Sequence, residues 1–260
     1  MNRKAFTLVE LLIVIVIIAS LLGITLPAIR HCKQKVQSLT CISNLRQLTL
    51  ALNSYANDST SYPYGFSDQP GMLYPPPEGY SGSSTADWVG WWWFELIGEV
   101  IKSSSAMDCP GSREDMLYKN LRGNYGVNYS ICKISPLAPK ETEFIGKPLK
   151  ATQIHQPAGV LLVMDAGYSL ISWKAATGDP SMSFENPKRN PWFYVPGLTS
   201  INERKTIDSA KTEDAIAGRH PGKTINAGFC DGHVDSLDAE SLAVERLPDT
   251  PVPHYRYWSP

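Results

Sequence analysis

The stretch that decides the fold is Phe6–Ile29, FTLVELLIVIVIIASLLGITLPAI. Its only polar side chains are those of Thr7, Glu10, Ser20 and Thr25. As a helix, this stretch would extend about 36 Å, which exceeds the roughly 30 Å hydrocarbon core of a bilayer. The stretch is therefore long enough to cross a membrane, and no other part of the sequence approaches it in apolar length.

Four interpretations compete for this segment: a cleaved secretory signal, a plain membrane anchor, a buried core helix and an assembly helix. A secretory signal has a shorter apolar region that ends in a small-residue cleavage site, whereas this run continues into Leu26-Pro27-Ala28-Ile29-Arg30. A core helix that is apolar on every side does not fit a protein of 260 residues. The anchor and the assembly helix remain, and Glu10 distinguishes them.

Glu10 is the one carboxylate inside the apolar stretch. A charged residue in a membrane segment costs about 3 kcal/mol on insertion scales and is functional by default. If the chain is cut before Phe6, the new α-amine is a cation at a similar depth in the membrane. Glu10 of one subunit can then pair with the amine of its neighbour, which would fix the register of assembling helices.

The residues around this cut carry a family resemblance. Lys4-Ala5-Phe6-Thr7-Leu8-Val9-Glu10 resembles the prepilin cleavage and methylation motif of type IV pilin-like proteins, which include the type II secretion pseudopilins. The resemblance implies that a prepilin peptidase cuts between Ala5 and Phe6 on the cytoplasmic side and N-methylates Phe6. Ala5 stands where the family usually has Gly. Arg3 and Lys4 agree with a cytoplasmic N-terminus under the positive-inside rule.

The helix is expected to continue beyond the apolar stretch. Gly23 and Pro27 lie one turn apart, and either can loosen or kink a helix. A simple helix end at the membrane surface is the alternative, whereas the resemblance favours a flexible point in a continuing helix. Apolar residues then recur on one helical face, at Cys41, Leu45, Leu48, Leu52 and Tyr55. We therefore predict one helix from Phe6 to about residue 57.

The predicted organisation has four segments. They are a basic leader at 1–5, a membrane and assembly half of the helix at 6–29, an amphipathic half at 30–60, and an exported head at 61–260. The resemblance implies a single pass through a bacterial inner membrane, with the head periplasmic or part of a cell-surface filament after assembly.

The head shows weaker signals. Asp87 is a candidate cap for a helix over 88–102, whose aromatic residues we expect in the core. Strands are predicted near 124–131 and 160–167, and a hairpin near 224–237 around Asp231-Gly232. Together these patterns predict an α+β, pilin-like fold in which the long helix lies on a small antiparallel sheet.

The five cysteines are too few for a disulfide scaffold, and an odd number leaves at least one unpaired. In an exported head, Cys109 and Cys132 are the first candidates for a disulfide. Two unpaired buried cysteines, or a bridge to Cys230, are the alternatives. Cys32 and Cys41 lie out of phase on the predicted helix and cannot bridge within it.

A second resemblance lies near the C-terminus. His220, Asp231 and Gly232 are similar to a His-x9-Asp-Gly signature of large pilin-like proteins, although ten residues separate His220 from Asp231 here. These side chains, with Asp165 and His233, are feasible metal ligands. No dense Asp/Asn loop suits calcium, however, and the spacing fits no standard zinc site. We therefore expect no metal and no cofactor, a hairpin turn at Asp231-Gly232, and a backbone hydrogen bond at His220.

The expected function is that of a structural subunit, a pseudopilin or minor pilin, and not an enzyme. No nucleophile elbow or phosphate loop is present, and a net charge of -1 without a basic patch indicates no nucleic acid partner. The expected partners are prepilin peptidase, other pilin-like subunits and the inner membrane. Two alternatives stay open: an exported hydrolase using His220 and Asp231, and a membrane-anchored module that binds polysaccharide through aromatic runs at 88–94, 192–194 and 255–258.

Overall fold

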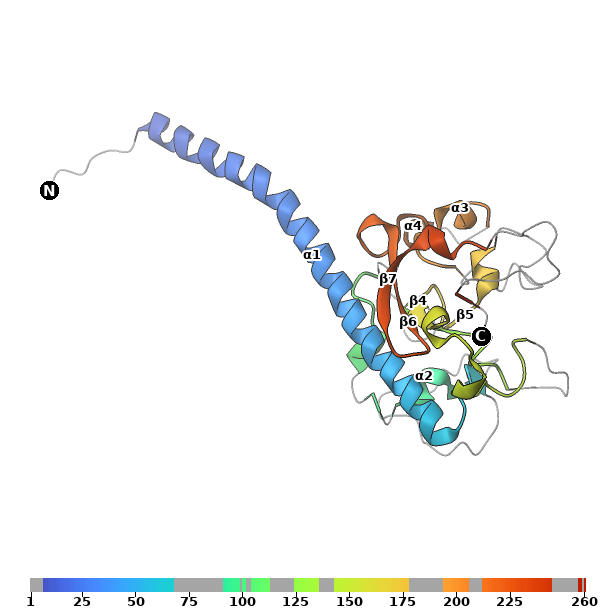
Figure 1. Ribbon diagram of the computed structural model, residues 1–260. Helices are drawn as coiled ribbons and strands as arrows, with labels where there is room; N and C mark the ends of the chain where they lie inside the picture. The colour runs from blue at the N-terminus through green and yellow to red at the C-terminus, as the bar shows by residue number, and fades with distance from the viewer. Residues whose placement is uncertain are drawn as a thin grey trace.

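The computed structural model of the chain describes residues 7–67, 91–98, 100–101, 104–112, 124–135, 143–177, 194–205, 212–244, 257–258 and 260. Figure 1 shows a long helix, α1, that projects from a head containing the other elements. The helices are α1 (Leu8–Ser59), α2 (Trp93–Leu96), α3 (Thr199–Asn202) and α4 (Thr212–Ala217). The strands are β1 (Phe66–Ser67), β2 (Trp91–Trp92), β3 (Tyr125–Asn128), β4 (Leu161–Asp165), β5 (Leu170–Ile171), β6 (Thr224–Phe229) and β7 (Val234–Asp238). Short 3-10 helices are η1 (Ser104–Met107), η2 (Ala151–Gln153), η3 (Pro157–Gly159), η4 (Trp173–Ala176), η7 (Pro221–Lys223) and η8 (Ala239–Leu242).

The predicted long helix is confirmed: α1 is one continuous helix of 52 residues. It ends at Ser59, and the C-cap residue Thr60 has a φ of 66°, in the left-handed region where helices commonly stop. Pro27 does not end α1. It does remove one backbone hydrogen bond, because proline has no N–H to donate to the Gly23 carbonyl. Figure 1 shows that α1 curves between its free end and the head.

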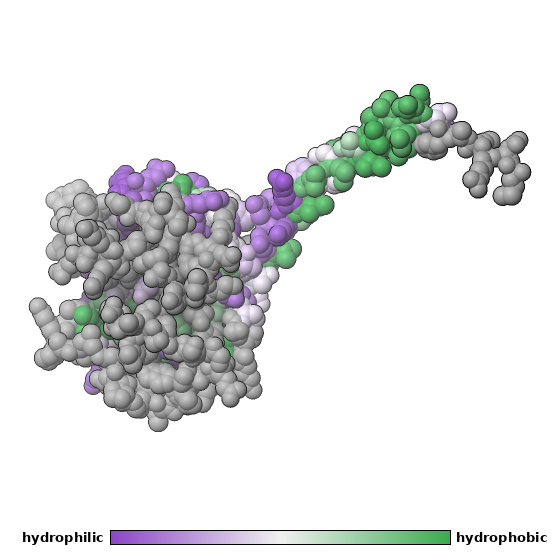
Figure 2. Space-filling view, turned by 180° about the vertical axis from the view of Figure 1, so that it is seen from behind, coloured by the Kyte–Doolittle hydropathy of each residue, from purple (hydrophilic) through white to green (hydrophobic). Residues whose placement is uncertain are grey.

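The two halves of α1 have different surroundings. Every side chain from residue 7 to residue 36 is exposed, and Cys41 is the first buried one. The predicted apolar face of the second half is confirmed, because Leu45, Leu48 and Leu52 are fully buried and Tyr55 packs partly buried against them. Figure 2 shows the apolar end projecting away from the head. Within the described residues, α1 is the one helix long and apolar enough to span a membrane.

The head contains a five-stranded sheet in the order β5-β3-β4-β6-β7. Three of its four strand pairs are antiparallel, including the predicted hairpin of β6 and β7. The fourth is not, because β5 runs parallel to β3. The chain turns after β4 and continues along the free edge of β3. There the Val127 N–H donates to the Ser169 carbonyl (3.1 Å) and the Tyr129 N–H to the Ile171 carbonyl (2.8 Å). The fold is thus α+β with a mixed sheet.

The buried half of α1 packs closely on the sheet at β6. Gly228 of β6 faces Thr49 of α1, and a Cβ atom at Gly228 would overlap the Thr49 hydroxyl. The Thr49 hydroxyl instead donates to the Leu45 carbonyl of its own helix at 2.7 Å. A missing side chain on the strand therefore allows the helix backbone to approach the sheet.

The predicted helix over 88–102 is wrong. Trp91 and Trp92 form β2, which pairs with β1, and only Trp93–Leu96 is helical in the described part of this range. The carboxylate of Glu95 accepts the Trp92 N–H at 2.7 Å, so the helix begins abruptly after the strand. Asp87, the predicted cap, lies outside the described residues. The expectation of core packing is confirmed, because Trp92, Trp93 and Phe94 are buried.

Candidate functional site

The N-terminal end of α1 is closed by a capping box between Thr7 and Glu10. The Glu10 carboxylate accepts the Thr7 N–H at 2.9 Å and the Thr7 hydroxyl at 2.8 Å, and the Glu10 N–H donates to Oγ1 of Thr7 at 3.2 Å. The sequence Thr-x-x-Glu before an apolar run is typical of such a cap, which satisfies backbone N–H groups that a helix start leaves free. Ala5 and Phe6, the residues of the predicted cut, lie outside the described residues.

Glu10 has no cationic partner among the residues that the structure describes, and its carboxylate is bonded to Thr7 of the same chain. The surrounding side chains of α1 are apolar and exposed, with Leu11 and Leu12 each 54% exposed. Gly23 lies in the same exposed half of α1, residues 8–36, which we call the bare half. A Cβ atom at Gly23 would have no neighbour within 4 Å. This end of the helix therefore presents one carboxylate in an apolar surface that the head does not cover.

In the head, the structure pairs His220 with Asp165. Nε2 of His220 lies 3.0 Å from Oδ2 of Asp165, and the Asn226 N–H donates to the same oxygen at 2.7 Å. The partner of His220 is a buried carboxylate, so the expected backbone hydrogen bond is wrong. Local sequence patterns do not reveal that the end of β4 lies beside the residue before η7, and this placement decides the partner of His220.

The charges of this pair stabilise each other. Burial alone would lower the pKa of His220, but the adjacent Asp165 carboxylate raises it to about 10. Burial would likewise raise the pKa of Asp165, but His220 and Arg219 hold it below its usual value. An imidazolium and a carboxylate therefore form a buried ion pair at neutral pH in the chain alone.

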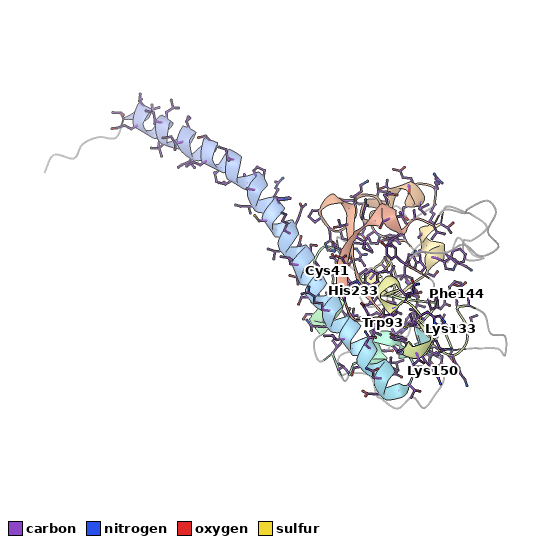
Figure 3. All side chains as sticks on the ribbon, in the orientation of Figure 1. Cys41, Trp93, Lys133, Phe144, Lys150 and His233 are labelled. Atoms are coloured by element: carbon purple, nitrogen blue, oxygen red, sulfur yellow. The ribbon has the colours of Figure 1, made fainter. Side chains whose placement is uncertain are left out.

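Two cysteine thiols complete the arrangement. Sγ of Cys41 lies 3.2 Å from Oδ1 of Asp165, and Sγ of Cys109 lies 3.8 Å from Nε2 of His220. Each residue is buried, and one side-chain atom from each lies within 4.8 Å of the others. We refer to Cys41, Cys109, Asp165 and His220 as the four-donor cluster. Figure 3 labels Cys41 where α1 meets the head.

The two thiols differ in acidity. A hydrogen bond from the Cys41 thiol lowers the pKa of Cys109, and nearby His220 and Arg219 act in the same direction. Burial raises the pKa of Cys41. Cys109 is therefore the thiol that ionises first.

A second buried ion pair lies next to the cluster. Arg219 and Asp214 approach within 2.8 Å, and both side chains are 1% exposed. The Arg219 guanidinium also donates to the carbonyls of Asn124 (2.6 Å) and Ala166 (3.0 Å). The Tyr194 hydroxyl donates to Asp214 at 2.9 Å. This network fixes the residue before His220 to the end of β4.

Asp231 and Gly232 make the predicted hairpin turn between β6 and β7. Gly232 has a φ of 98°, and its N–H donates to the Phe229 carbonyl at 3.0 Å. Asp231 accepts the His233 N–H at 3.1 Å and lies 2.5 Å from Nδ1 of His233. The two parts of the C-terminal signature thus make separate contacts: His220 bonds to Asp165, and Asp231 bonds to His233.

The cysteines are not bonded to one another: all five are free thiols. Cys109, in the four-donor cluster, and Cys132, the predicted partners, are thus unbonded in the structure. Cys132 instead lies near Cys230, and burial raises the pKa of both thiols. The Tyr62 hydroxyl is close to Cys230. Cys32 is exposed on α1.

Aromatic residues proposed for glycan binding are mostly placed in the core. Trp92, Trp93, Phe94, Tyr194 and Trp258 are all buried. Trp88, Trp192 and Phe193 lie outside the described residues. The described members of these aromatic runs therefore give no exposed stacking surface, apart from the half-buried Tyr257.

Asp165 and His220 are feasible ligands from the sequence alone, whereas no sequence signal marks Cys41 or Cys109 as a ligand. Cys41 fits the predicted apolar face of the helix, because buried cysteine behaves as a small hydrophobe. Its position in the sequence lies 124 residues from Asp165, and Cys109 lies 111 residues from His220. Only the packing of α1 on the sheet brings these side chains together.

Comparison with known proteins supports the assignment of the N-terminal segment. Residues 1–26 match the prokaryotic N-terminal methylation motif. This match and the long apolar helix support a type IV pilin-like protein, with the α+β, pilin-like layout described above. The chain has no match among curated proteins or solved structures.

Proposed function

We propose that the chain is a pseudopilin or minor pilin, a structural subunit that assembles through the bare half of α1. The observation that carries the proposal is Glu10 within an exposed apolar helix. Every side chain from residue 7 to residue 36 is exposed, so this half needs lipid or other helices around it. A carboxylate in such surroundings needs a cation, and the described residues of the chain supply none.

Processing would supply that cation. A prepilin peptidase removes residues 1–5 and methylates the amine of Phe6, which stays positively charged. In a bundle of subunits, this amine pairs with Glu10 of a neighbouring chain. Glu10 would then exchange its bonds to Thr7 for a charged partner, and the exchange sets the axial step between subunits.

The remaining segments follow from this arrangement. Residues 6–29 lie in the inner membrane before assembly, with the leader in the cytoplasm. Residues 30–60 pass into the exported head at 61–260 and pack on its sheet. Gly23 and Pro27 give the helix a flexible point between the two halves. The machine is of the type II secretion or type IV pilus kind, and the chain acts by position and not by catalysis.

Mass spectrometry of the mature N-terminus tests the proposal. Chain isolated from a host with an active prepilin peptidase is expected to begin with N-methylated Phe6. The same chain from a host lacking that peptidase is the matched control and should keep residues 1–5. An intact leader in both hosts would leave only a plain membrane anchor. An Ala5→Gly variant should be cut at least as completely as the native sequence.

A further inference from the structure

The four-donor cluster has the composition of a transition-metal site. It offers two thiols, one imidazole nitrogen and one carboxylate, all buried and all within 4.8 Å of one another. Zn²⁺ is bound by these three ligand types, usually by four of them in a tetrahedron. Calcium and magnesium take oxygen ligands and would not use the two sulfurs.

The distances agree with such a site. Zinc bonds of about 2.3 Å to sulfur and about 2.0–2.2 Å to nitrogen and oxygen put tetrahedral ligands roughly 3.3–3.8 Å apart. Cys109 and His220 are 3.8 Å apart, and Cys41 and Asp165 are 3.2 Å apart. Asp165 and His220 are 3.0 Å apart. All four donor atoms lie within 4.8 Å of one another, so side-chain shifts of up to about 1 Å would bring them to these separations around one ion.

Neighbouring groups hold the donors in place. The Asn226 N–H holds the Asp165 carboxylate, and the Asn124 side chain accepts the Cys109 N–H at 3.1 Å. On α1, the Gln37 amide donates to the Pro110 carbonyl at 2.8 Å, and the Asn44 amide donates to the Asp108 carbonyl at 2.9 Å. The loop that carries Cys109 is thus fastened to α1 on both sides of Cys41. Outer contacts of this kind are what orients the ligands of a metal site.

The charges also balance. Binding of the ion leaves both thiols deprotonated and His220 neutral, while the Asp165 carboxylate is already ionised. The ion with two thiolates and one carboxylate carries a net charge of -1. The Arg219 guanidinium lies close by, because it donates to the carbonyl of Ala166, the residue after Asp165. A buried cation is therefore in place to offset the remaining charge.

We propose that the four-donor cluster is a structural zinc site that fastens α1 to the head. Its ligands come from four separate parts of the chain: α1, the loop after η1, the end of β4 and the residue before η7. Cys41 is the first buried residue of α1, so the ion would sit where the helix leaves the head. A site with four protein ligands has no open position for substrate, which makes its role structural.

Metal analysis of the full chain in detergent tests this site. The chain is purified with reductant, stripped with chelator, exchanged with Zn²⁺ and dialysed. One zinc ion per chain is expected, lost in Cys109→Ser and retained in Cys132→Ser, which changes a buried free cysteine outside the cluster. Exchange with Co²⁺ should give thiolate-to-cobalt charge-transfer absorption and the intense visible bands of a tetrahedral ion.

A variant that exchanges one ligand for another distinguishes the loss of a ligand from misfolding of the chain. Asp165→Cys replaces an oxygen donor by a third thiolate, so it should keep the metal and strengthen the charge-transfer absorption. The proposal is overturned if the reduced native chain binds no stoichiometric zinc, or if Cys109→Ser binds as much as the native chain. It is also overturned if peptide mapping without reductant finds Cys41 and Cys109 joined by a disulfide and the reduced chain does not take up zinc.

Discussion

Cys41 of the long helix and Asp165 at the end of β4 meet in the interior, with Sγ of the thiol 3.2 Å from Oδ1 of the carboxylate. Every side chain from residue 7 to residue 36 is exposed, and from Cys41 onward one face of the helix is buried. The contact therefore marks the junction between the exposed half of α1 and the folded head.

Glu10 has two candidate roles that separate variants distinguish. Glu10→Gln keeps an acceptor for the Thr7 N–H but removes the charge, whereas Thr7→Val removes the capping hydroxyl and keeps the charge. If the charge pairs with a neighbouring amine, Glu10→Gln should fail to co-assemble and Thr7→Val should assemble nearly as the native chain does. Co-purification with partner subunits from membranes measures this. Normal assembly of Glu10→Gln would assign Glu10 to helix capping alone.

Gly228 should be sensitive to substitution although it has no side chain. A Cβ atom at this position would overlap the Thr49 hydroxyl, so Gly228→Ala should lower the free energy of unfolding by about 1–3 kcal/mol. Gly159→Ala is the matched control, because a Cβ there meets nothing within 4 Å. Its effect should stay within about 0.5 kcal/mol. Denaturant unfolding of the full chain in detergent measures both.

Relief of the overlap gives a second test of the same contact. Adding Thr49→Ala to Gly228→Ala removes the hydroxyl and one methyl group, so the double variant should be more stable than the sum of the two single effects predicts. Strict additivity would mean that α1 and β6 do not approach each other as closely as the structure has them.

Much of this architecture follows from local sequence, since α1 is defined by a continuous apolar run and by a repeating face from Cys41 to Leu52. The β6–β7 hairpin follows from Asp231-Gly232 between two strand-like runs. The register of β5 beside β3 does not, because a parallel edge pair depends on where the chain passes after β4. The helix predicted over 88–102 includes α2 but wrongly also β2, because Trp91 and Trp92 fit a helix face as well as a strand.

Only two of the four residues of the four-donor cluster could be predicted from the sequence as feasible ligands. His220 and Asp165 were visible as feasible ligands, but their pairing depends on the register of β4 beside β6. Cys41 and Cys109 gave no spacing signal, since the ligands belong to four separate parts of the chain. Zinc motifs that can be read from sequence have their ligands in closely spaced pairs, and this cluster has none.

The pair of Asp214 and Arg219 should be essential for stability. Both side chains are 1% exposed, so Asp214→Ala would leave a buried guanidinium without its carboxylate and should destabilise the chain by about 3–5 kcal/mol. Replacing both partners together, as Asp214→Leu with Arg219→Met, should cost less than the sum of the single replacements. Thermal unfolding of each variant, with chelator present to keep the chain free of metal, measures these losses of stability. An Asp214→Ala chain as stable as the native one would contradict the buried pair.

Thiol reactivity provides a direct check of the cysteine arrangement. Of the five free thiols, only that of Cys32 is exposed, so the folded chain should react with one equivalent of a polar maleimide. Cys32→Ser should abolish this reaction, because burial shields the other four thiols. Denaturation without reductant and with chelator present should release all five thiols. A chain that yields only three under those conditions contains a disulfide, and peptide mapping would then identify whether Cys109 is joined to Cys132 or to Cys41.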